Sequence, residues 1–206
     1  MQMKRNEWLD EKEVDRDPIR QFQIWLDDAI AANIPLAEAM TLATATPDGR
    51  PAARMVLLKQ VDHNGFVFFT NYRSAKARQL DANPYAALVF YWNLLERQVR
   101  VEGSVVRTSA EESHEYFQTR PRESQIGAWA SEQSAVINSR DVLEQRAQEL
   151  ETLYCDKEID CPEYWGGYRL KPDRIEFWKG RLGRLHDRIL YELDSSGTWT
   201  ISRLAP

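Results

Sequence analysis

The chain has 206 residues, of which 43% are hydrophobic and 29% are charged, and its formal net charge at pH 7 is −5. These values predict a soluble globular protein with one main domain, and the acidic balance argues against general nucleic-acid binding, which needs a dominant basic surface. No apolar run approaches the roughly 20 residues that cross a bilayer, and Met1–Trp8 lacks the apolar core of a secretory signal, so we expect a cytoplasmic location.

Cysteine and histidine are sparse. Cys155 and Cys161 are the only cysteines, and their spacing matches no zinc or redox pattern. The three histidines, His63, His114 and His186, are scattered along the chain. We therefore expect no metal site.

The first predicted element is a helix over residues 18–33. Asp17-Pro18 provides an N-cap followed by proline at the first helical position. Apolar residues then recur at helical spacing, at Ile19, Phe22, Trp25, Leu26, Ala29 and Ile30. We expect residues 1–16 to form a flexible N-terminal segment and residues 17–206 to form a single domain.

Strands and short helices alternate along the rest of the chain. A helix is predicted over 74–81, a capping box at Ser109–Glu112 opens another, and a polar helix is predicted over 140–154. The predicted strands cover residues 39–46, 51–61, 66–70, 85–93, 97–107, 168–170, 174–178, 185–193 and 198–203.

This order of elements predicts an α+β domain built on a closed or half-closed, mostly antiparallel β-barrel with flanking helices. There is no alternating βαβ pattern, and no glycine-rich loop follows a strand. A Rossmann or P-loop nucleotide site is therefore not expected.

The segment Arg181–Arg188 holds three arginines and a histidine. On a strand, Arg184, His186 and Arg188 would share one face. Three cations on one face of an acidic protein repel one another unless an anion lies between them, which favours an anion site. The alternative is a solvated strand face that Asp187 partly neutralises.

Three other segments are candidates for anion binding. Arg54 and Lys59 stand at the two ends of an apolar strand; their odd separation directs them to opposite faces unless a bulge intervenes. They are either strand-end charges or contacts to different groups of one ligand.

At Asn71–Lys76 the chain passes from a strand into a helix, and the start of a helix favours a phosphate. Capping of the helix by Ser74 explains these residues nearly as well. In residues 119–134, Arg120 with Ser124 suits a phosphate.

Taken together, these segments resemble the pyridoxamine 5′-phosphate oxidase family, in order from about residue 17 to the last residue. The matching segments are Arg54–Lys59, Thr70-Asn71, Ser74–Lys76, Leu95–Val99, Arg120–Trp129, Glu132–Ser134, Tyr164–Gly167, Phe177-Trp178, Arg184–Arg188 and Arg203–Pro206.

The resemblance implies a homodimer with a split-barrel fold that binds FMN at the subunit interface. It also implies oxidation of pyridoxamine or pyridoxine 5′-phosphate to pyridoxal 5′-phosphate, in vitamin B6 biosynthesis and salvage, with O₂ as acceptor and hydrogen peroxide as product. By position, the implied FMN-binding residues are Arg54, Met55, Val56, Leu57, Leu58, Lys59, Phe69, Thr70, Lys76, Gln98, Gln133, Ser134, Trp178 and Arg188.

The implied substrate-binding residues are Lys59, Tyr116, Arg120, Ser124, Arg184, Leu185 and His186. Of these, Tyr116, Arg120 and Ser124 would hold the substrate phosphate with help from Lys59. Arg184 and His186, the implied catalytic residues, would hold the pyridine ring against the flavin. The alternatives are a split-barrel flavin oxidase for another substrate, such as a phenazine precursor, and a non-catalytic protein that stores FMN or pyridoxal phosphate.

The chain departs from the family pattern at three places. Ala75 stands where many relatives carry arginine, and Phe69 replaces a common tyrosine. The segment before Asp17 is acidic, so a basic N-terminal lid is not expected. The missing cation at residue 75 predicts weaker FMN retention.

Overall fold

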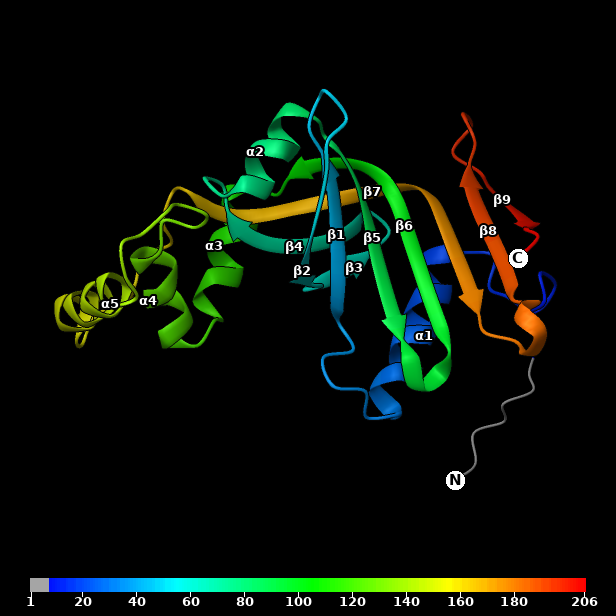
Figure 1. Cartoon of the computed structure of the whole chain (residues 1–206), viewed down its shortest axis with the longest axis horizontal. Coiled ribbons are helices and arrows are strands. Elements are labelled where there is room, and N and C mark those ends of the chain that lie inside the picture. Colours follow the sequence, from blue (N-terminus) through cyan, green and yellow to red (C-terminus); the bar gives the residue numbers. More distant parts are fainter. Residues whose placement is uncertain (1–7) are drawn as a thin grey trace.

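The computed structural model describes residues 8–206, which form one curled antiparallel sheet with helices at its ends and on one face (Figure 1). The strands are β1 (Ala39–Ala45), β2 (Pro51–Leu57), β3 (Gln60–Asp62), β4 (Gly65–Asn71), β5 (Tyr85–Trp92), β6 (Arg97–Arg107), β7 (Trp165–Lys179), β8 (Asp187–Leu193) and β9 (Trp199–Arg203). The helices are α1 (Pro18–Ala31), α2 (Ala75–Ala82), α3 (Ala110–Gln118), α4 (Arg122–Ala130) and α5 (Asp141–Tyr154), with short 3₁₀ turns η1 (Asn93–Leu95) and η2 (Leu182–Arg184). The predicted α+β half-barrel is confirmed.

The long strand β7 joins the two ends of the sheet. The strand order is β2-β1-β5-β6-β7-β4-β3, and β8 also pairs with β7. Residues 165–170 of β7 pair with β4, and residues 174–179 pair with β8. Strand β6 follows β7 along both halves, with a bulge between Glu102 and Gly103. A Cβ added at Gly103 would lie 2.0 Å from the Lys171 carbonyl oxygen, so this close crossing requires glycine.

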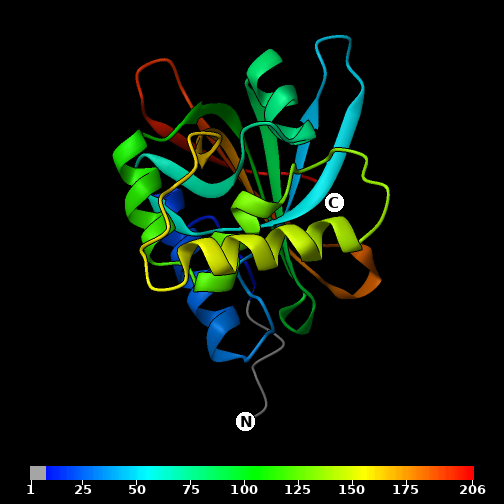
Figure 2. The ribbon, with the colours of Figure 1, turned by 90° about the vertical axis from the view of Figure 1, so that its left-hand side faces the viewer.

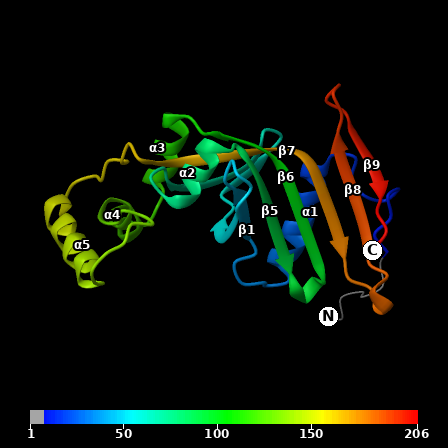
Figure 3. The ribbon, with the colours of Figure 1, turned by 45° about the horizontal axis from the view of Figure 1, so that its top comes forward.

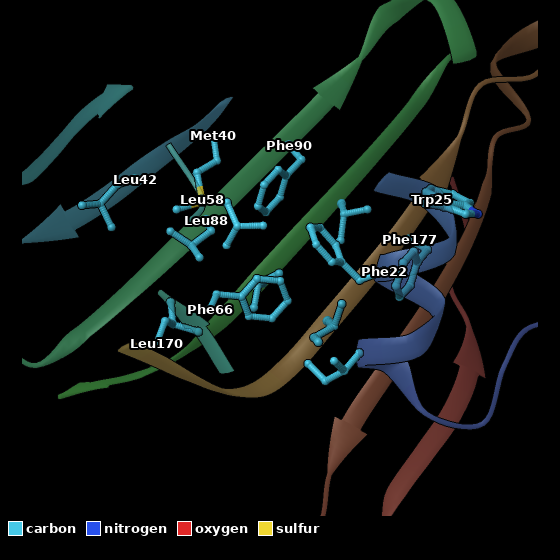
Figure 4. Close-up of a cluster of buried hydrophobic side chains, with 14 of the residues drawn as sticks. Phe22, Trp25, Met40, Leu42, Leu58, Phe66, Leu88, Phe90, Leu170 and Phe177 are labelled. Carbon is cyan, nitrogen blue, oxygen red and sulfur yellow. The ribbon is translucent and has the colours of Figure 1, made fainter. Parts of the chain in front are cut away.

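Helix α1 covers the inner face of the sheet and supplies much of the core. Asp17 caps it as predicted, because its carboxylate accepts a hydrogen bond from the Ile19 amide. The Phe22 ring lies 4.9 Å from Phe66 and 4.8 Å from Phe90, and Trp25 lies 5.1 Å from Phe177 between ring centroids (Figure 4). Such aromatic pairs contribute beyond the area they bury.

A second, smaller core attaches α3, α4 and α5 to the start of β7. Phe117 of α3, Ile126 of α4, Ile159 and Trp165 form this cluster. Helix α5 contains no fully buried residue and lies outermost, beyond α4 (Figures 2 and 3). Helix α4 was not predicted as a helix.

Residues 8–16 pack on the same body. Leu9 and Val14 belong to the main core, and the Tyr191 hydroxyl donates a hydrogen bond to the Asp15 carbonyl oxygen at 2.7 Å. None of the helices in residues 8–206 is both long and apolar enough to cross a membrane.

Candidate functional site

A cavity of about 480 Å³ lies at one end of the sheet, bordered by β2, β4, α2, α3 and α4. Four cationic side chains, Arg54, Lys59, Lys76 and Arg120, line it, and no aspartate or glutamate is among its described lining residues. Because partly buried charge without a counter-ion is unfavourable, this cationic cavity is suited to anions. The other lining residues are Met55, Val56, Leu57, Phe69, Thr70, Asn71, Tyr116, Ser124, Gly127, Ala128, Ser131, Gln133 and Trp165.

Within the described part of the chain, Arg54 is held by neutral acceptors. Its Nη1 donates to the Leu42 carbonyl oxygen at 3.1 Å and to Thr44 Oγ1 at 2.7 Å, and its Nη2 donates to Gln79 Oε1 at 3.0 Å. Burial lowers the pKa of Arg54. These contacts fix the guanidinium in place without cancelling its charge.

Lys76 lies beside the N-terminus of α2. Its Nζ donates to Gln133 Oε1 at 2.7 Å and to Thr70 Oγ1 at 3.1 Å, which are again neutral partners. Burial, and secondly the nearby charge of Arg54, lower the pKa of Lys76. The Ala75 amide donates to Ser134 Oγ at 3.2 Å, so residue 134 reaches the same helix end although it does not line the cavity.

Arg120 has a buried hydrogen-bond donor that is left unsatisfied within the described residues. Its Nη1 is buried and has no hydrogen-bond partner among residues 8–206, and its guanidinium lies 4.7 Å from the Trp165 ring centroid. Burial lowers the pKa of Arg120, while Tyr116 and Cys161 oppose that shift. A buried donor of this kind costs about 1–3 kcal/mol when unsatisfied, which favours a ligand with acceptor oxygens.

An aromatic stack forms the wall next to Arg120. The centroid of the Phe69 ring lies 4.0 Å from that of Tyr116 and 5.4 Å from that of Trp165, and the Phe69 ring is nearly parallel to both. The hydroxyl that a tyrosine at residue 69 would provide is absent, but the stacking surface remains.

A break in the strand brings Arg54 and Lys59 into one cavity. The predicted strand 51–61 is interrupted: β2 ends at Leu57 and β3 begins at Gln60. Leu58 turns into the main core, where it is 6% exposed, and does not line the cavity. The prediction of one continuous strand was therefore wrong, and the interruption removes the odd-spacing objection to a shared ligand.

A second group of predicted site residues lies elsewhere. The predicted residues Gln98, Trp178 and Arg188 occupy paired positions across β6, β7 and β8. Tyr91, which was not predicted as a site residue, pairs with Gln98 from β5, and we call these four residues the outer row. Their neighbours Phe90, Val99, Phe177 and Ile189 are fully buried against the core. Since successive strand residues point to opposite faces, the outer row is on the face of the sheet away from α1.

The prediction that Arg184, His186 and Arg188 share one strand face was wrong. Strand β8 begins at Asp187, Arg184 ends the η2 turn, and Gly183 and Arg184 have φ values of 68° and 63°. These left-handed conformations form a loop over residues 180–186. Arg188 alone of the three lies on β8, while the His186 ring lies 4.7 Å from Trp178.

The structure thus divides the predicted site residues into two groups. The cationic cavity includes Arg54, Met55, Val56, Leu57, Lys59, Phe69, Thr70, Lys76, Tyr116, Arg120, Ser124 and Gln133. Gln98, Trp178, Arg184, Leu185, His186 and Arg188 do not line it. In Figure 1 the β7–β8 loop lies at the opposite end of the molecule from α3 and α4.

Five lining residues were not predicted as site residues: Asn71, Gly127, Ala128, Ser131 and Trp165. Each falls within or beside a segment that matches the family pattern. Their side chains are neutral and small or apolar, so charge and spacing gave no signal for them. Asn71 is the last residue of β4. The other four enter the cavity because the smaller core docks α4 and β7 beside it.

Comparison with known proteins gives a consistent result along the whole chain. Residues 26–154 match the family model described as pyridoxamine 5′-phosphate oxidase, and residues 165–206 match the pyridoxine 5′-phosphate oxidase C-terminal dimerisation region. A pyridoxine/pyridoxamine 5′-phosphate oxidase of Paraburkholderia xenovorans (strain LB400) is 59% identical over 199 residues, covering 96% of this chain and 93% of the relative.

Solved structures show the same fold. PhzG from Burkholderia lata 383, in complex with tetrahydrophenazine-1-carboxylic acid, has a TM-score of 0.92 and 30% identity, with 98% of each chain covered. A pyridoxamine 5′-phosphate oxidase-related, FMN-binding protein from Nostoc punctiforme PCC 73102 has a TM-score of 0.74 and 19% identity, covering 94% of this chain and all of the other.

Proposed function

This chain belongs to the pyridoxamine 5′-phosphate oxidase family, and we propose that it is an FMN-dependent oxidase that makes pyridoxal 5′-phosphate. Pyridoxine 5′-phosphate and O₂ give pyridoxal 5′-phosphate and hydrogen peroxide. Oxidation of pyridoxamine 5′-phosphate gives the same two products, but it also consumes one water and releases ammonia. The observation that carries the proposal is the cationic cavity, which is lined by four cationic side chains and, among the described residues, by no aspartate or glutamate. Cofactor and substrate each bring a phosphate to it.

The residues around α2 fit the FMN phosphate. Lys76 is bound only to neutral oxygens, and the free amides of a helix N-terminus favour an anion. Gln133 and Ser134 lie within hydrogen-bonding distance of Lys76 and the Ala75 amide, respectively. Arg54 adds a second charge beside Lys76. When bound, FMN accepts a hydride equivalent from the substrate and passes the electrons to O₂.

The residues around Arg120 fit the substrate phosphate. The buried Nη1 without a partner supplies a donor, and Tyr116, Ser124 and Lys59 line the same cavity. Guanidinium and hydroxyl groups match phosphate oxygens in charge and geometry. Arg120 and Lys76 thereby bind separate phosphates at the two sides of one cavity.

The remaining predicted residues reach the cavity in a homodimer. The C-terminal residues 165–206 match a dimerisation region, and that region contains Trp178, Arg184, His186 and Arg188. A second copy of the chain brings its outer row and its β7–β8 loop over the cavity of the first. Gln98, Trp178 and Arg188 then contact FMN, while Arg184, Leu185 and His186 hold the substrate ring. The protein's contribution is alignment, which can be worth about a hundredfold in rate per ångström.

A peroxide-coupled assay tests this function. We expect turnover with pyridoxine 5′-phosphate and pyridoxamine 5′-phosphate, little with unphosphorylated pyridoxine, and a yellow protein that releases FMN on denaturation. A yellow protein that produces no peroxide with any of the three would refute the oxidase and favour a storage role.

The similarity to PhzG gives a second candidate, oxidation of a reduced phenazine precursor. The unpartnered donor of Arg120 suits a phosphate or a carboxylate, so the choice of substrate is decided by turnover. Turnover of tetrahydrophenazine-1-carboxylic acid in preference to the two phosphorylated vitamers would favour the second candidate.

A further inference from the structure

The β7–β8 loop, residues 180–186, has almost no apolar anchor. Leu182 and Leu185 are 97% and 72% exposed, and no residue of η2 is buried. Burial of apolar groups therefore does not fix the loop. Its conformation depends on polar contacts where it joins β8.

The carboxylate of Asp187 is the centre of those contacts. Asp187 is 4% exposed, and its Oδ2 accepts from Arg181 Nε at 2.6 Å and from the Leu9 amide at 3.2 Å. Its Oδ1 accepts from Arg203 Nη1 at 3.1 Å. Burial favours the neutral acid, but the donors from Arg181 and Leu9 outweigh it, and the pKa of Asp187 is lowered.

A second contact, within the loop, connects Arg181 to His186. The Arg181 backbone amide donates to His186 Nδ1 at 3.1 Å. A ring nitrogen that accepts a hydrogen bond carries no proton. The neutral imidazole consistent with this bond therefore has its hydrogen on Nε2.

Arg181 takes part in both contacts, through its side chain and its backbone. The side chain is bound to Asp187, and the backbone amide is bound to His186. Residues 8–11 cover the outside of this arrangement: the Trp8 ring lies 4.7 Å from the Arg181 guanidinium, and Arg203 donates to the Leu9 carbonyl oxygen at 2.7 Å. We infer that Asp187 is a positioning residue that, through Arg181, holds His186 in the Nε2–H tautomer so that it acts as a hydrogen-bond donor.

The effect on turnover rests on the proposed function, whereas the tautomer does not. A His186 held in this way donates through Nε2 to an acceptor on the substrate ring. Loss of Asp187 removes the carboxylate to which Arg181 Nε is bound, loosens the Arg181 amide and lets the His186 ring rotate or exchange tautomers. FMN binding depends on other residues and stays intact.

The test uses the FMN-loaded protein labelled with ¹⁵N-histidine. His186 is assigned by the loss of its signals in His186→Gln, and its two ring nitrogens are observed at mildly alkaline pH. We expect widely separated signals with the hydrogen on Nε2 in the wild type. In Asp187→Asn and Arg181→Ala the two signals move towards each other, whereas those of His63 and His114 stay in place. Arg181→Lys, which keeps a cation for Asp187, lies nearer the wild type.

Kinetics provides the second readout. We expect kcat with pyridoxine 5′-phosphate to fall about tenfold or more in Asp187→Asn and Arg181→Ala, with FMN affinity unchanged. Glu192→Gln removes an exposed carboxylate from the same strand and leaves both readouts unchanged. If Asp187→Asn does not fold, Arg181→Ala decides, because Asp187 there retains Arg203 and the Leu9 amide.

Two results would overturn the inference. One is a wild-type His186 with its hydrogen on Nδ1 or with mixed tautomers. The other is a tautomer signal or a kcat that stays at the wild-type value in Arg181→Ala. A wild type without oxidase activity would refute the proposed function alone, since the nitrogen signals still report the tautomer.

Discussion

Arg188 and Glu176 form a two-pronged ion pair on the outer face of the sheet, with Arg188 Nε 2.7 Å from Glu176 Oε1 and Nη2 3.0 Å from Oε2. Glu176 is 5% exposed, and its Oε2 also accepts a hydrogen bond from Arg100 Nη1 at 3.3 Å. The hydrogen bonds and charge of Glu176 raise the pKa of Arg188. This pair fixes the orientation of a guanidinium that we assign to FMN in the partner's cavity.

Glu176→Gln should therefore weaken both the fold and cofactor binding. The free energy of unfolding should fall by about 1–3 kcal/mol, because Arg188 and Arg100 lose a buried, charged acceptor. The FMN dissociation constant should rise on the order of tenfold as Arg188 loses its orientation. Urea unfolding and FMN titration measure the two effects. Asp173→Asn, at an exposed carboxylate on the same strand, is the control; equal effects in both variants would contradict the assignment.

Arg120→Ala should act on the substrate rather than on FMN. Removing charge-assisted hydrogen bonds of about 1.5–3 kcal/mol raises KM for pyridoxine 5′-phosphate roughly 10- to 150-fold. The weak activity with unphosphorylated pyridoxine should change little, which makes that substrate the internal control. Steady-state kinetics with both substrates gives the comparison. An equal loss with both would show that Arg120 does not recognise the phosphate.

Ala75→Arg should tighten FMN binding. Ala75 is exposed at the N-terminus of α2, next to Lys76 and Ser134, so an arginine there has room to reach a phosphate. An exposed cation contributes about 0.5–1.5 kcal/mol at such a site, or up to roughly tenfold in affinity. Titrating apoprotein with FMN measures the change, with Ala75→Gln as a neutral control of similar length. The idea fails if the arginine variant binds no more tightly than the glutamine variant.

FMN affinity should fall at alkaline pH because of Lys76. Burial and the charge of Arg54 lower the pKa of Lys76. As the pH rises, Lys76 therefore loses its proton and its positive charge at a lower pH than an ordinary lysine, whose pKa is near 10.4. The phosphate stays dianionic above about pH 7, so the lysine accounts for the loss. FMN titrations at a series of pH values from neutral upward record it. In Lys76→Arg the dependence should disappear, and its persistence there would assign it to another group.

Mixing two impaired variants, assayed at low substrate concentration, tests whether sites are shared between subunits. Arg120→Ala damages the cavity and His186→Ala damages the β7–β8 loop. After joint unfolding and refolding, about half of the dimers combine both variants, and one of their two sites is intact if the loop comes from the partner. Activity should then recover to about one quarter of the wild-type value. No recovery, with mixed dimers confirmed by differently tagged chains, would place both residues in the same subunit.

Local patterns predicted the elements whose start is marked by a side chain. Asp17 and Ser109 accept amide hydrogen bonds as expected and begin α1 and α3. Helix α4 follows Pro121, which provides no side-chain cap, and it was missed. Strand β7 was predicted as two strands, over 168–170 and 174–178, but it is continuous. The bulge at Gly103 accommodates Pro172, which lies opposite it.

The site residues were recognisable one by one, but their grouping was not. Arg54 and Lys59 meet because Leu58 turns into the core, an effect of tertiary packing. Arg184 and His186 leave the predicted strand because Arg181 pairs with Asp187 and Gly183 adopts a positive φ. Both depend on contacts or backbone angles that alternation of residue types does not encode.

The 15 residues of β7 run without interruption from Trp165, which lines the cavity, to Trp178 and Lys179 beside the β7–β8 loop. In the proposed dimer, each β7 therefore begins in its own subunit's catalytic centre and ends in the partner's. A one-residue slip of this strand would turn Trp165 and Trp178 to the wrong face together. The pairing register of a single strand thus sets the relative placement of two reaction centres, and neither can be rebuilt without regard to the other.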